Sequence, residues 1–397
     1  MTTFRFRALR RPRAAPRLGP AVLAAAAALA CAGPCAARAA EYRVETVAEG
    51  LEFPWSLAFL PDGRMLVTER AGRLRLIAPD ASGRPALRAQ PVAGVPAAMV
   101  HGQAGLFEVL VDPDFATNGW IYLSYAHGTR RANHLRVARA RFDGERLHAV
   151  RTLFTSQPAK RHEQHFGARM ALLGDGTLAV GIGDGNVERT DAQRLGTHLG
   201  KIVRIGRDGS VPADNPFVGR AGALPEIYST GHRNPQGMAF VAGGAPGAPG
   251  GHREGTLYSH EHGSKGGDEL NVVRPGANYG WPVATASLDY NGARISPYRT
   301  LAGVVPARVE WTPAIAPAGL AHYDGGLFPA WRGSLFVAAL KEKSVRRVPV
   351  ADGAPGAQEV LFRELDARMR DVRAAPDGAL YLLTDEERGR VLRVVPR

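Results

Sequence analysis

Short apolar runs closed by turn residues recur along the chain after residue 40, and few stretches there show helical periodicity. The stretch 53–77, FPWSLAFLPDGRMLVTERAGRLRLI, contains an apolar segment, a Pro-Asp-Gly turn, a second apolar segment, a polar tip with glycine, and a third apolar segment. Asp-Gly and Pro-Asp-Gly turns between apolar runs are strong hairpin signals. We therefore predict three consecutive antiparallel strands here.

The same pattern recurs, which predicts a repeat architecture. MRDVRAAPDGALYLLTDEERGRVLRVV (369–395) follows it closely, and further copies begin at residues 105 and 165. Two looser copies occupy 234–276 and 317–350. Six units of antiparallel strands predict an all-β fold, a six-bladed β-propeller in one domain around a central channel. A multi-sheet sandwich is the alternative, and the extension of the repeat to both ends of 41–397 disfavours it.

Two segments lie outside the regular repeat. The extra strand expected at 42–50 would pair with the last blade and close the ring, which removes exposed strand edges. The Gly/Pro/Ala-rich insertion GGAPGAPGGHREG at 243–255 is predicted to be an exposed loop.

The first 40 residues have the features of a secretory signal peptide, with cleavage expected near Ala40. A basic segment precedes the apolar run at 21–33 and a series of small residues. We expect a periplasmic or secreted protein; lipidation at Cys31 or Cys35 is disfavoured because neither has a leucine three residues before it. Removing 1–40 also removes seven arginines and both cysteines, and lowers the formal net charge from +13 to +6. The remaining charge suits an anionic ligand, and the lack of basic runs interleaved with aromatics argues against nucleic acid.

Polar clusters interrupt the apolar pattern at equivalent points of the units. They precede first strands at 101–106, 163–170 and 230–238, and they follow strand pairs at 181–186, 260–271, 338–343 and 365–372. Loops of the innermost strands converge on one face of a propeller channel. We therefore expect one site to contain Gln103, His165, Asp184, Arg233, Asn234, Lys341, Arg368 and Arg370. One imidazole among four cations fits a ligand with several carboxylates or phosphates.

Other chemistries lack their motifs. The chain has no G-x-S-x-G turn for a nucleophilic serine, and no helix is expected after GIGDGN, so it is not a dinucleotide fingerprint. The stretch HEQHFGARM (162–170) does not have HExxH spacing, so zinc at His162, Glu163 and His165 is disfavoured. Zinc at His260 and His262 is equally weak. We interpret His162 and Glu163 as loop surface.

The motifs GHRNPQG (231–237) and DELNVVRPGANYGWP (268–282) resemble those of the glucose/sorbosone dehydrogenase-like quinoproteins, soluble aldose dehydrogenases that bind pyrroloquinoline quinone (PQQ). GQAGL, HFGAR with Asp184 nineteen residues after His165, and Lys341 followed by RxR 27 residues later also match. The resemblance covers about 43–396. It implies a PQQ- and Ca²⁺-dependent oxidoreductase that converts aldoses to lactones, with a quinone or cytochrome as electron acceptor and a monomeric or homodimeric state.

The resemblance also implies residue roles. His165 is similar to the family's general base, Asp184 would orient it, and Arg233 would polarise the PQQ carbonyl. Contacts with PQQ would come from Gln103, Arg233, Asn234, Tyr290, Ala339, Leu340, Lys341, Arg368, Met369 and Arg370. One calcium ion would bind near the carbonyls of Gly263 and Ser264, and a second would use Glu269 and the Tyr279 carbonyl. Two alternatives remain open: a calcium-dependent lactonase-type hydrolase, and a propeller that binds ligands but has lost PQQ.

Overall fold

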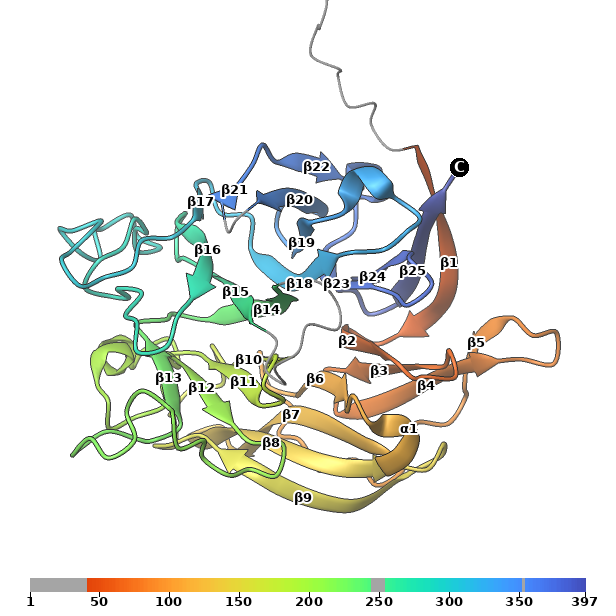
Figure 1. Cartoon of the computed structure of the whole chain (residues 1–397), viewed down its shortest axis with the longest axis horizontal. Coiled ribbons are helices and arrows are strands. Elements are labelled where there is room, and N and C mark those ends of the chain that lie inside the picture. Colours follow the sequence, from red (N-terminus) through yellow and green to blue (C-terminus); the bar gives the residue numbers. More distant parts are fainter. Residues whose placement is uncertain (1–40, 244–253, 352–353) are drawn as a thin grey trace, which may run out of the picture. The chain divides into compact units, whose positions relative to one another are not determined.

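The computed structural model describes residues 41–397 except 244–253 and 352–353, and these residues form six antiparallel sheets around a common centre (Figure 1). The predicted six-bladed β-propeller is therefore confirmed. The predicted signal peptide at 1–40 and most of the loop predicted at 243–255 lie outside the described residues. No helix in the described part of the chain has the length and apolar character needed to cross a membrane.

Blades 1 to 3 follow the chain from its first repeat. Blade 1 contains β2 (Pro54–Phe59), β3 (Met65–Glu69), β4 (Arg73–Pro79) and β5 (Pro85–Leu87). Blade 2 contains β6 (Leu106–Val111), β7 (Trp120–Thr129), β8 (Ala132–Phe142) and β9 (Leu147–Thr155). Blade 3 contains β10 (Gly167–Leu172), β11 (Leu178–Ile182), β12 (Lys201–Ile205) and β13 (Ile227–Thr230).

Blades 4 to 6 complete the ring. Blade 4 contains β14 (Pro235–Ala242), β15 (Gly255–Glu261), β16 (Asp268–Val273) and β17 (Val309–Trp311). Blade 5 contains β18 (Pro317–Tyr323), β19 (Ser334–Ala339), β20 (Ser344–Ala351), β21 (Ala354–Pro355) and β22 (Glu359–Leu361). Blade 6 contains β23 (Met369–Ala374), β24 (Leu380–Thr384), β25 (Gly389–Pro396) and β1 (Tyr42–Leu51). The described helices are α1 (Phe115–Asn118), η1 (Arg189–Gln193), η2 (Pro329–Trp331) and η3 (Arg363–Leu365).

Strand β1 closes the ring as predicted. It pairs antiparallel with β25, with Tyr42 opposite Pro396 (Figure 1). Blade 6 thus combines the beginning and the end of the described chain, so the ring opens only if these hydrogen bonds break. This pairing leaves no unpaired first or last strand of the propeller.

Apolar side chains fill the spaces between neighbouring blades. Between blades 2 and 3, Phe107 and Tyr122 pack in one buried cluster with Met170 and Val180. Each blade packs against a neighbouring blade on both of its faces. Consecutive residues of an inner strand such as β6 (LFEVLV) are therefore buried, although their side chains point to opposite faces of the sheet. Each fully buried large apolar side chain contributes about 1.5–3 kcal/mol to the stability of the ring.

Buried charges join the innermost strands at the centre of the propeller. The Arg169 guanidinium lies 3.1 Å from Glu108 Oε2 and 3.1 Å from Asp371 Oδ1, the latter an ion-pair distance without hydrogen-bond geometry. Arg373 donates to Asp371 Oδ2 at 2.8 Å and pairs with Glu108. The side chains of Glu108 and Asp371 are fully buried. Two cations and two carboxylates therefore neutralise one another away from solvent.

The central charge cluster, defined as Glu108, Arg169, Asp371 and Arg373, also contacts the other blades. Arg169 donates to the backbone carbonyl of Gln236 on β14 at 2.8 Å, and Ser56 on β2 donates to Glu108 at 2.6 Å. On β18, a Cβ at Gly319 would lie 2.2 Å from Asp371 Oδ1, so only glycine fits there. All six innermost strands thus meet around these charges.

Candidate active site

His165 lies at the start of β10 and faces Asp184, which follows β11. The imidazole Nδ1 is 2.7 Å from Asp184 Oδ1, and His165 is only 5% exposed. Because a carboxylate accepts hydrogen bonds only, Nδ1 carries the proton and Nε2 is the unprotonated nitrogen of the neutral ring. The structure therefore brings the predicted pair together with its basic nitrogen available.

The electrostatics of this pair favour a neutral imidazole beside an ionised carboxylate. Burial lowers the pKa of His165, and the positive charges of Arg233 and Lys160 add to this effect against the opposing influence of Asp184. Burial raises the pKa of Asp184, but the hydrogen bond from His165 and the positive charge of Arg233 outweigh it and hold that pKa below its usual value. Such a histidine can accept a proton at neutral pH.

Close backbone packing fixes the position of His165. Its φ is +48°, in the left-handed region, and its N–H donates to Gln103 Oε1 at 2.9 Å. A Cβ at Gly183, just after β11, would lie 2.1 Å from the His165 carbonyl oxygen. Gly183 therefore permits the close approach that brings Asp184 within reach of the imidazole.

The second carboxylate oxygen of Asp184 accepts a hydrogen bond from Trp281 Nε1 at 2.7 Å. We expect Trp281→Phe to lower the free energy of unfolding by about 1–3 kcal/mol, because a buried carboxylate loses a donor. Chemical denaturation measures this loss. Trp311→Phe is the matched control, since Trp311 Nε1 donates at 2.8 Å to the neutral amide of Gln358. Equal losses in both variants would contradict a special role for the charged acceptor.

Arg233 and Asn234 lie between β13 and β14, on the same side as His165. The Arg233 guanidinium donates to the His262 carbonyl at 3.3 Å and to the Tyr290 hydroxyl at 3.4 Å, and it lies 5.3 Å from the Trp281 ring. No carboxylate forms an ion pair with it among the described residues. Its charge is therefore available to an anionic ligand, although Tyr290 itself is 65% exposed.

Glu261 on β15 holds the backbone of this segment. Its carboxylate accepts hydrogen bonds from the N–H groups of Arg233 and Asn234, and from His232 Nδ1 at 2.9 Å. The Asn234 side chain accepts from the Gly167 N–H at 3.1 Å. Asn234 thus connects the segment before β14 to the beginning of β10, and its side-chain oxygen accepts a hydrogen bond from the protein itself.

Arg368 and Arg370 share one carboxylate, Asp385, which follows β24. Nε and Nη2 of Arg370 donate to Asp385 Oδ1 at 3.1 and 3.0 Å, and Nε and Nη2 of Arg368 donate to Oδ2 at 3.2 and 3.1 Å. Burial raises the pKa of Asp385, but the charges of Arg370 and Arg368 outweigh it and lower that pKa. Met369 between them is buried in the apolar cluster of blades 5 and 6, so only its backbone can face the channel.

The predicted cofactor segment 339–341, at the end of β19, has two buried residues and one exposed residue. Ala339 and Leu340 are buried, and the N–H groups of Leu340 and Lys341 donate to carbonyls of Ala316 and Ile315. The Lys341 side chain is exposed, and no hydrogen bond or ion pair holds its ammonium group in the described part of the chain. Lys341 is thus a second cation available to a ligand.

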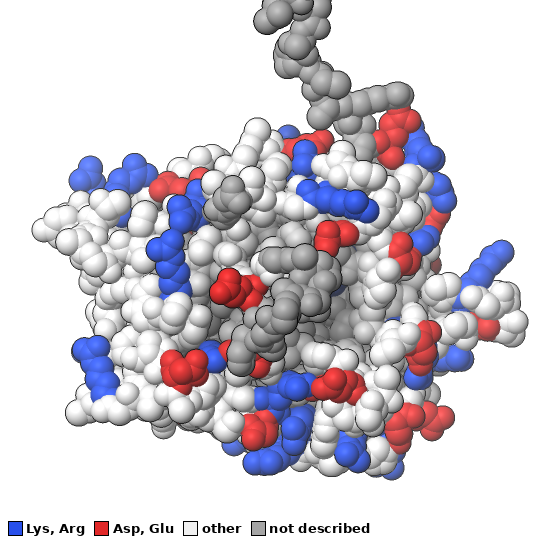
Figure 2. All heavy atoms as spheres, in the orientation of Figure 1, with Lys and Arg blue, Asp and Glu red and all other residues white. Residues whose placement is uncertain are grey.

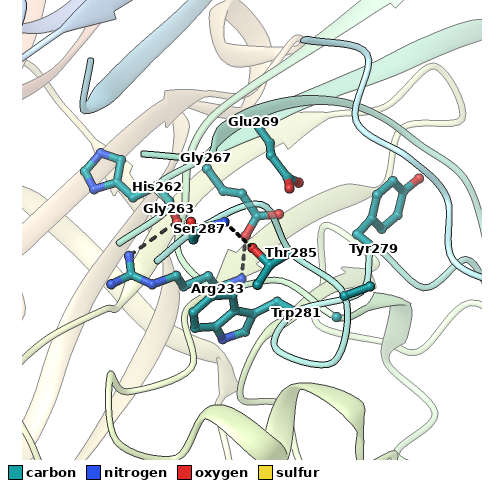
Figure 3. A pocket seen from close by; sticks show the side chains of 12 residues that line it. Arg233, His262, Gly263, Gly267, Glu269, Tyr279, Trp281, Thr285 and Ser287 are labelled. Carbon is teal, nitrogen blue, oxygen red and sulfur yellow. Dashed lines mark hydrogen bonds between the residues drawn. The ribbon is translucent and has the colours of Figure 1, made fainter. Parts of the chain in front are cut away.

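Three of the four predicted metal residues line one small cavity, shown in Figure 3: Gly263, Glu269 and Tyr279. The cavity volume is about 10 Å³, which is enough for a single ion or water molecule. The Tyr279 hydroxyl points away from the cavity and donates to the Val272 carbonyl at 2.6 Å, which leaves the backbone of Tyr279 for a ligand. Ser264 directly follows Gly263 and is buried, and its hydroxyl has no hydrogen-bond partner among the described residues.

Glu269 is a half-buried acid among other acids. Burial, followed by the negative charges of Glu261 and Glu310, raises the pKa of Glu269 to about 8. Asn271 donates to Glu269 Oε2 at 3.2 Å, and its own Oδ1 has no partner. No group of three His, Cys, Asp or Glu suited to a metal occurs within the described ranges. Two carboxylates supplemented by backbone carbonyls suit a hard cation such as calcium better than zinc.

The other histidines considered as zinc ligands have different surroundings. His162 is exposed, and Glu163 beside it accepts a hydrogen bond from Arg130 and lies 2.9 Å from His101 Nδ1, which agrees with the predicted loop surface. Nε2 of His260 lies 3.3 Å from the Gly319 carbonyl, and Nε2 of His262 lies 2.7 Å from the Pro317 carbonyl. Both rings thus connect β15 to β18.

Sequence reasoning missed three residues that hold the site together: Trp281, Glu261 and Asp385. Trp281 lies in the motif DELNVVRPGANYGWP and Glu261 in the polar cluster 260–271, but nothing in their spacing indicates contact with Asp184 or with the Arg233 backbone. Asp385 lies in a polar hairpin tip after β24. Its position at the end of a second strand, equivalent to Asp184 in blade 3, was the one available signal.

Comparisons with known proteins identify the family and its fold. The family model described as Glucose / Sorbosone dehydrogenase matches residues 51–393. The chain is 38% identical to aldose sugar dehydrogenase YliI of Escherichia coli over 91% of this chain and 95% of that protein, and the apo crystal structure of the E. coli enzyme superposes with a TM-score of 0.81. A glucose dehydrogenase crystal structure is 41% identical, with a TM-score of 0.82 over 88% of this chain and 99% of that one. The PQQ-bound aldose sugar dehydrogenase of Streptomyces coelicolor is 28% identical, with a TM-score of 0.69 over 89% and 99%.

Proposed function

The chain belongs to the glucose/sorbosone dehydrogenase family, and we propose that it is a PQQ-dependent dehydrogenase that oxidises aldoses to lactones. The observation that carries this proposal is the buried His165–Asp184 pair, a proton acceptor, together with the Arg233 guanidinium, which forms no ion pair with a carboxylate among the described residues. With the signal peptide expected at 1–40, we also propose that the enzyme works outside the cytoplasm.

The residues present fit PQQ, which carries three carboxylates. Arg233 and Lys341 have no carboxylate partner in the described residues, and Arg368 and Arg370 together share only Asp385. Four cations with one carboxylate among them leave an excess of positive charge for an anionic cofactor. Figure 2 shows acidic and basic side chains interspersed over the visible part of one face of the molecule.

The chain's own residues supply positioning and proton transfer. When bound, PQQ supplies the two-electron acceptor for the hydride that leaves the sugar. His165 Nε2 would accept the proton of the anomeric hydroxyl, so that the sugar loses one proton and one hydride to form the lactone. Asp184 would stabilise the imidazolium that results, and it holds the ring in the required tautomer. Arg233 would stabilise negative charge that develops on a neighbouring oxygen.

Reconstitution tests the function directly. The purified apoprotein is mixed with PQQ and Ca²⁺, and a dye acceptor is followed during incubation with neutral aldoses. We expect bleaching of the dye and PQQ absorbance that stays with the protein after desalting. Absence of both across a panel of aldoses would overturn the proposal. Hydrolysis of lactones without PQQ would instead favour the lactonase alternative.

We also propose that calcium binds at the cavity lined by Glu269 and Tyr279. Ca²⁺ should stabilise the apoprotein by about 2.7 kcal/mol when the free ion is a hundredfold above its Kd, because the ion offsets the repulsion between Glu261 and Glu269. Thermal unfolding with and without Ca²⁺ measures this shift. Glu269→Gln should abolish it.

The matched control for this prediction is Glu310→Gln. Glu310 lies opposite Glu269 in the sheet, but it pairs with Arg299 at 3.2 Å at the surface. This variant should keep the calcium-induced shift. A shift that survives Glu269→Gln would place calcium elsewhere.

A further inference from the structure

Lys160 is a buried cation beneath the loop that carries His165. It is 2% exposed, and Nζ donates to the carbonyl oxygens of His162 at 2.7 Å and Gln164 at 2.9 Å. Nζ also lies 3.2 Å from the centroid of the Phe166 ring. No carboxylate is within ion-pair distance of Nζ among the described residues. A buried lysine without an acidic partner is unusual, because transferring its charge from water is costly.

The two carbonyl groups that Lys160 binds flank the segment leading into His165. His165 has a left-handed φ of +48°, which is uncommon for residues other than glycine, although asparagine, aspartate and histidine adopt it more often than the rest. The backbone of Lys160 is fixed in turn, since Lys160 and Asn133 exchange both backbone hydrogen bonds, at 2.8 and 3.0 Å. Lys160 thus connects the β7–β8 hairpin of blade 2 to the loop of the candidate base.

We propose that Lys160 is a positioning residue for the reaction: its ammonium group holds the 161–166 loop so that His165 faces Asp184, and its charge favours the neutral imidazole. The first part rests on the contacts alone. The second part rests on the proposed function, in which His165 accepts a proton.

The charged groups around His165 and Asp184 determine in which direction the pKa of His165 moves when the Lys160 charge is removed. Asp184 acts on His165 from the end of β11, Arg233 from the segment before β14, and Lys160 from the loop of His165 itself. The His262 ring, just after β15, also interacts electrostatically with His165. The negative charges of Glu188, Glu163 and Asp184 in turn raise the pKa of Lys160, against the larger lowering effect of burial. Removing the ammonium group leaves Arg233 as the main cation near His165, so protonation of the imidazole becomes easier.

The test compares Lys160→Met with Lys201→Met. Lys201 is the matched control because it is also buried, and its Nζ donates to the carbonyls of Asp191, Ala192 and Leu199 at 2.8–3.0 Å, away from the 161–166 loop. Methionine keeps an apolar stem of similar length in both variants. Burial lowers the pKa of both lysines to about 7, so the two substitutions remove comparable groups.

Two readouts separate positioning from general stability. In the apoprotein, Lys160→Met should accelerate amide hydrogen exchange selectively in 161–166. With PQQ, Ca²⁺ and a neutral aldose, it should lower kcat/KM by about tenfold to a hundredfold, and the acidic limb of its pH profile should move to higher pH. Lys201→Met should change neither the rate of amide hydrogen exchange in 161–166 nor the position of the acidic limb of the pH profile.

Identical loop exchange and an identical acidic limb in the two variants would overturn the proposal. If Lys160→Met does not fold, Lys160→Gln replaces it: the amide keeps a donor but not the charge, so the limb should still move upward. An unshifted limb in that variant would also contradict the proposal. Because hydrogen exchange needs no cofactor, a wild-type protein without dehydrogenase activity would refute the proposed function and leave the loop contact testable.

Discussion

His165→Asn is expected to lower kcat with neutral aldoses by about 10²–10⁴-fold, while the affinity for PQQ stays near that of the wild type. Asparagine tolerates the left-handed φ of +48° better than most residues, and its amide can donate to Asp184 in place of Nδ1–H. The substitution therefore removes the basic nitrogen and preserves the backbone. Stopped-flow or steady-state dye reduction measures kcat, and a spectroscopic titration measures PQQ binding.

His162→Asn is the matched control, because His162 is exposed on the same loop. We expect turnover close to that of the wild type in this variant. Normal turnover in His165→Asn would show that another group accepts the proton. Loss of PQQ binding in His165→Asn would instead show that the imidazole contributes to the cofactor site.

Arg169→Met is expected to lower the free energy of unfolding by about 3–5 kcal/mol, the largest stability effect predicted here. Its removal leaves two buried carboxylates, Glu108 and Asp371, with Arg373 as their one remaining cation in the cluster. The lost donor bonds to Gln236 and Arg370 also loosen contacts between blades 3, 4 and 6. Equilibrium denaturation in urea measures the change.

Arg299→Met controls for the loss of an arginine from an ion pair at the surface. The Arg299 side chain is 72% exposed and pairs with Glu310 at 3.2 Å, so its removal should cost no more than about 1 kcal/mol. A loss of similar size in Arg169→Met would mean that the central charge cluster contributes little to the ring. If Arg169→Met does not fold at all, Glu108→Gln removes one charge from the same cluster and should also destabilise the protein.

Much of the fold was predictable because each blade repeats a local signal. The Pro-Asp-Gly turn at 61–63 and its copy at 376–378 lie between β2 and β3 and between β23 and β24. Outer strands were harder to predict. β5 and β17 have three residues each, too few to show alternation, and only their pairing with β4 and β16 identifies them as strands.

The site was predictable where its residues recur at the same strand ends. His165, Arg233 and Arg368 each precede an innermost strand, and Asp184 follows a second strand, so the propeller geometry brings them to one face. Their specific roles came from family resemblance and remain proposals. The contacts of Trp281, Glu261 and Asp385 were not predictable, because each joins segments that are separated by loops of irregular length.

The number of blades, the closure by β1 and the face on which the polar residues gather follow from the sequence, because apolar periodicity and turn chemistry are local properties. Which charges neutralise one another depends on the folded arrangement. Asp385 pairs with Arg368 and Arg370, Arg233 has no carboxylate partner within the described ranges, and Lys160 is buried under the His165 loop. Those outcomes depend on distances between strands far apart in the chain, and electrostatic interactions change steeply with distance and burial.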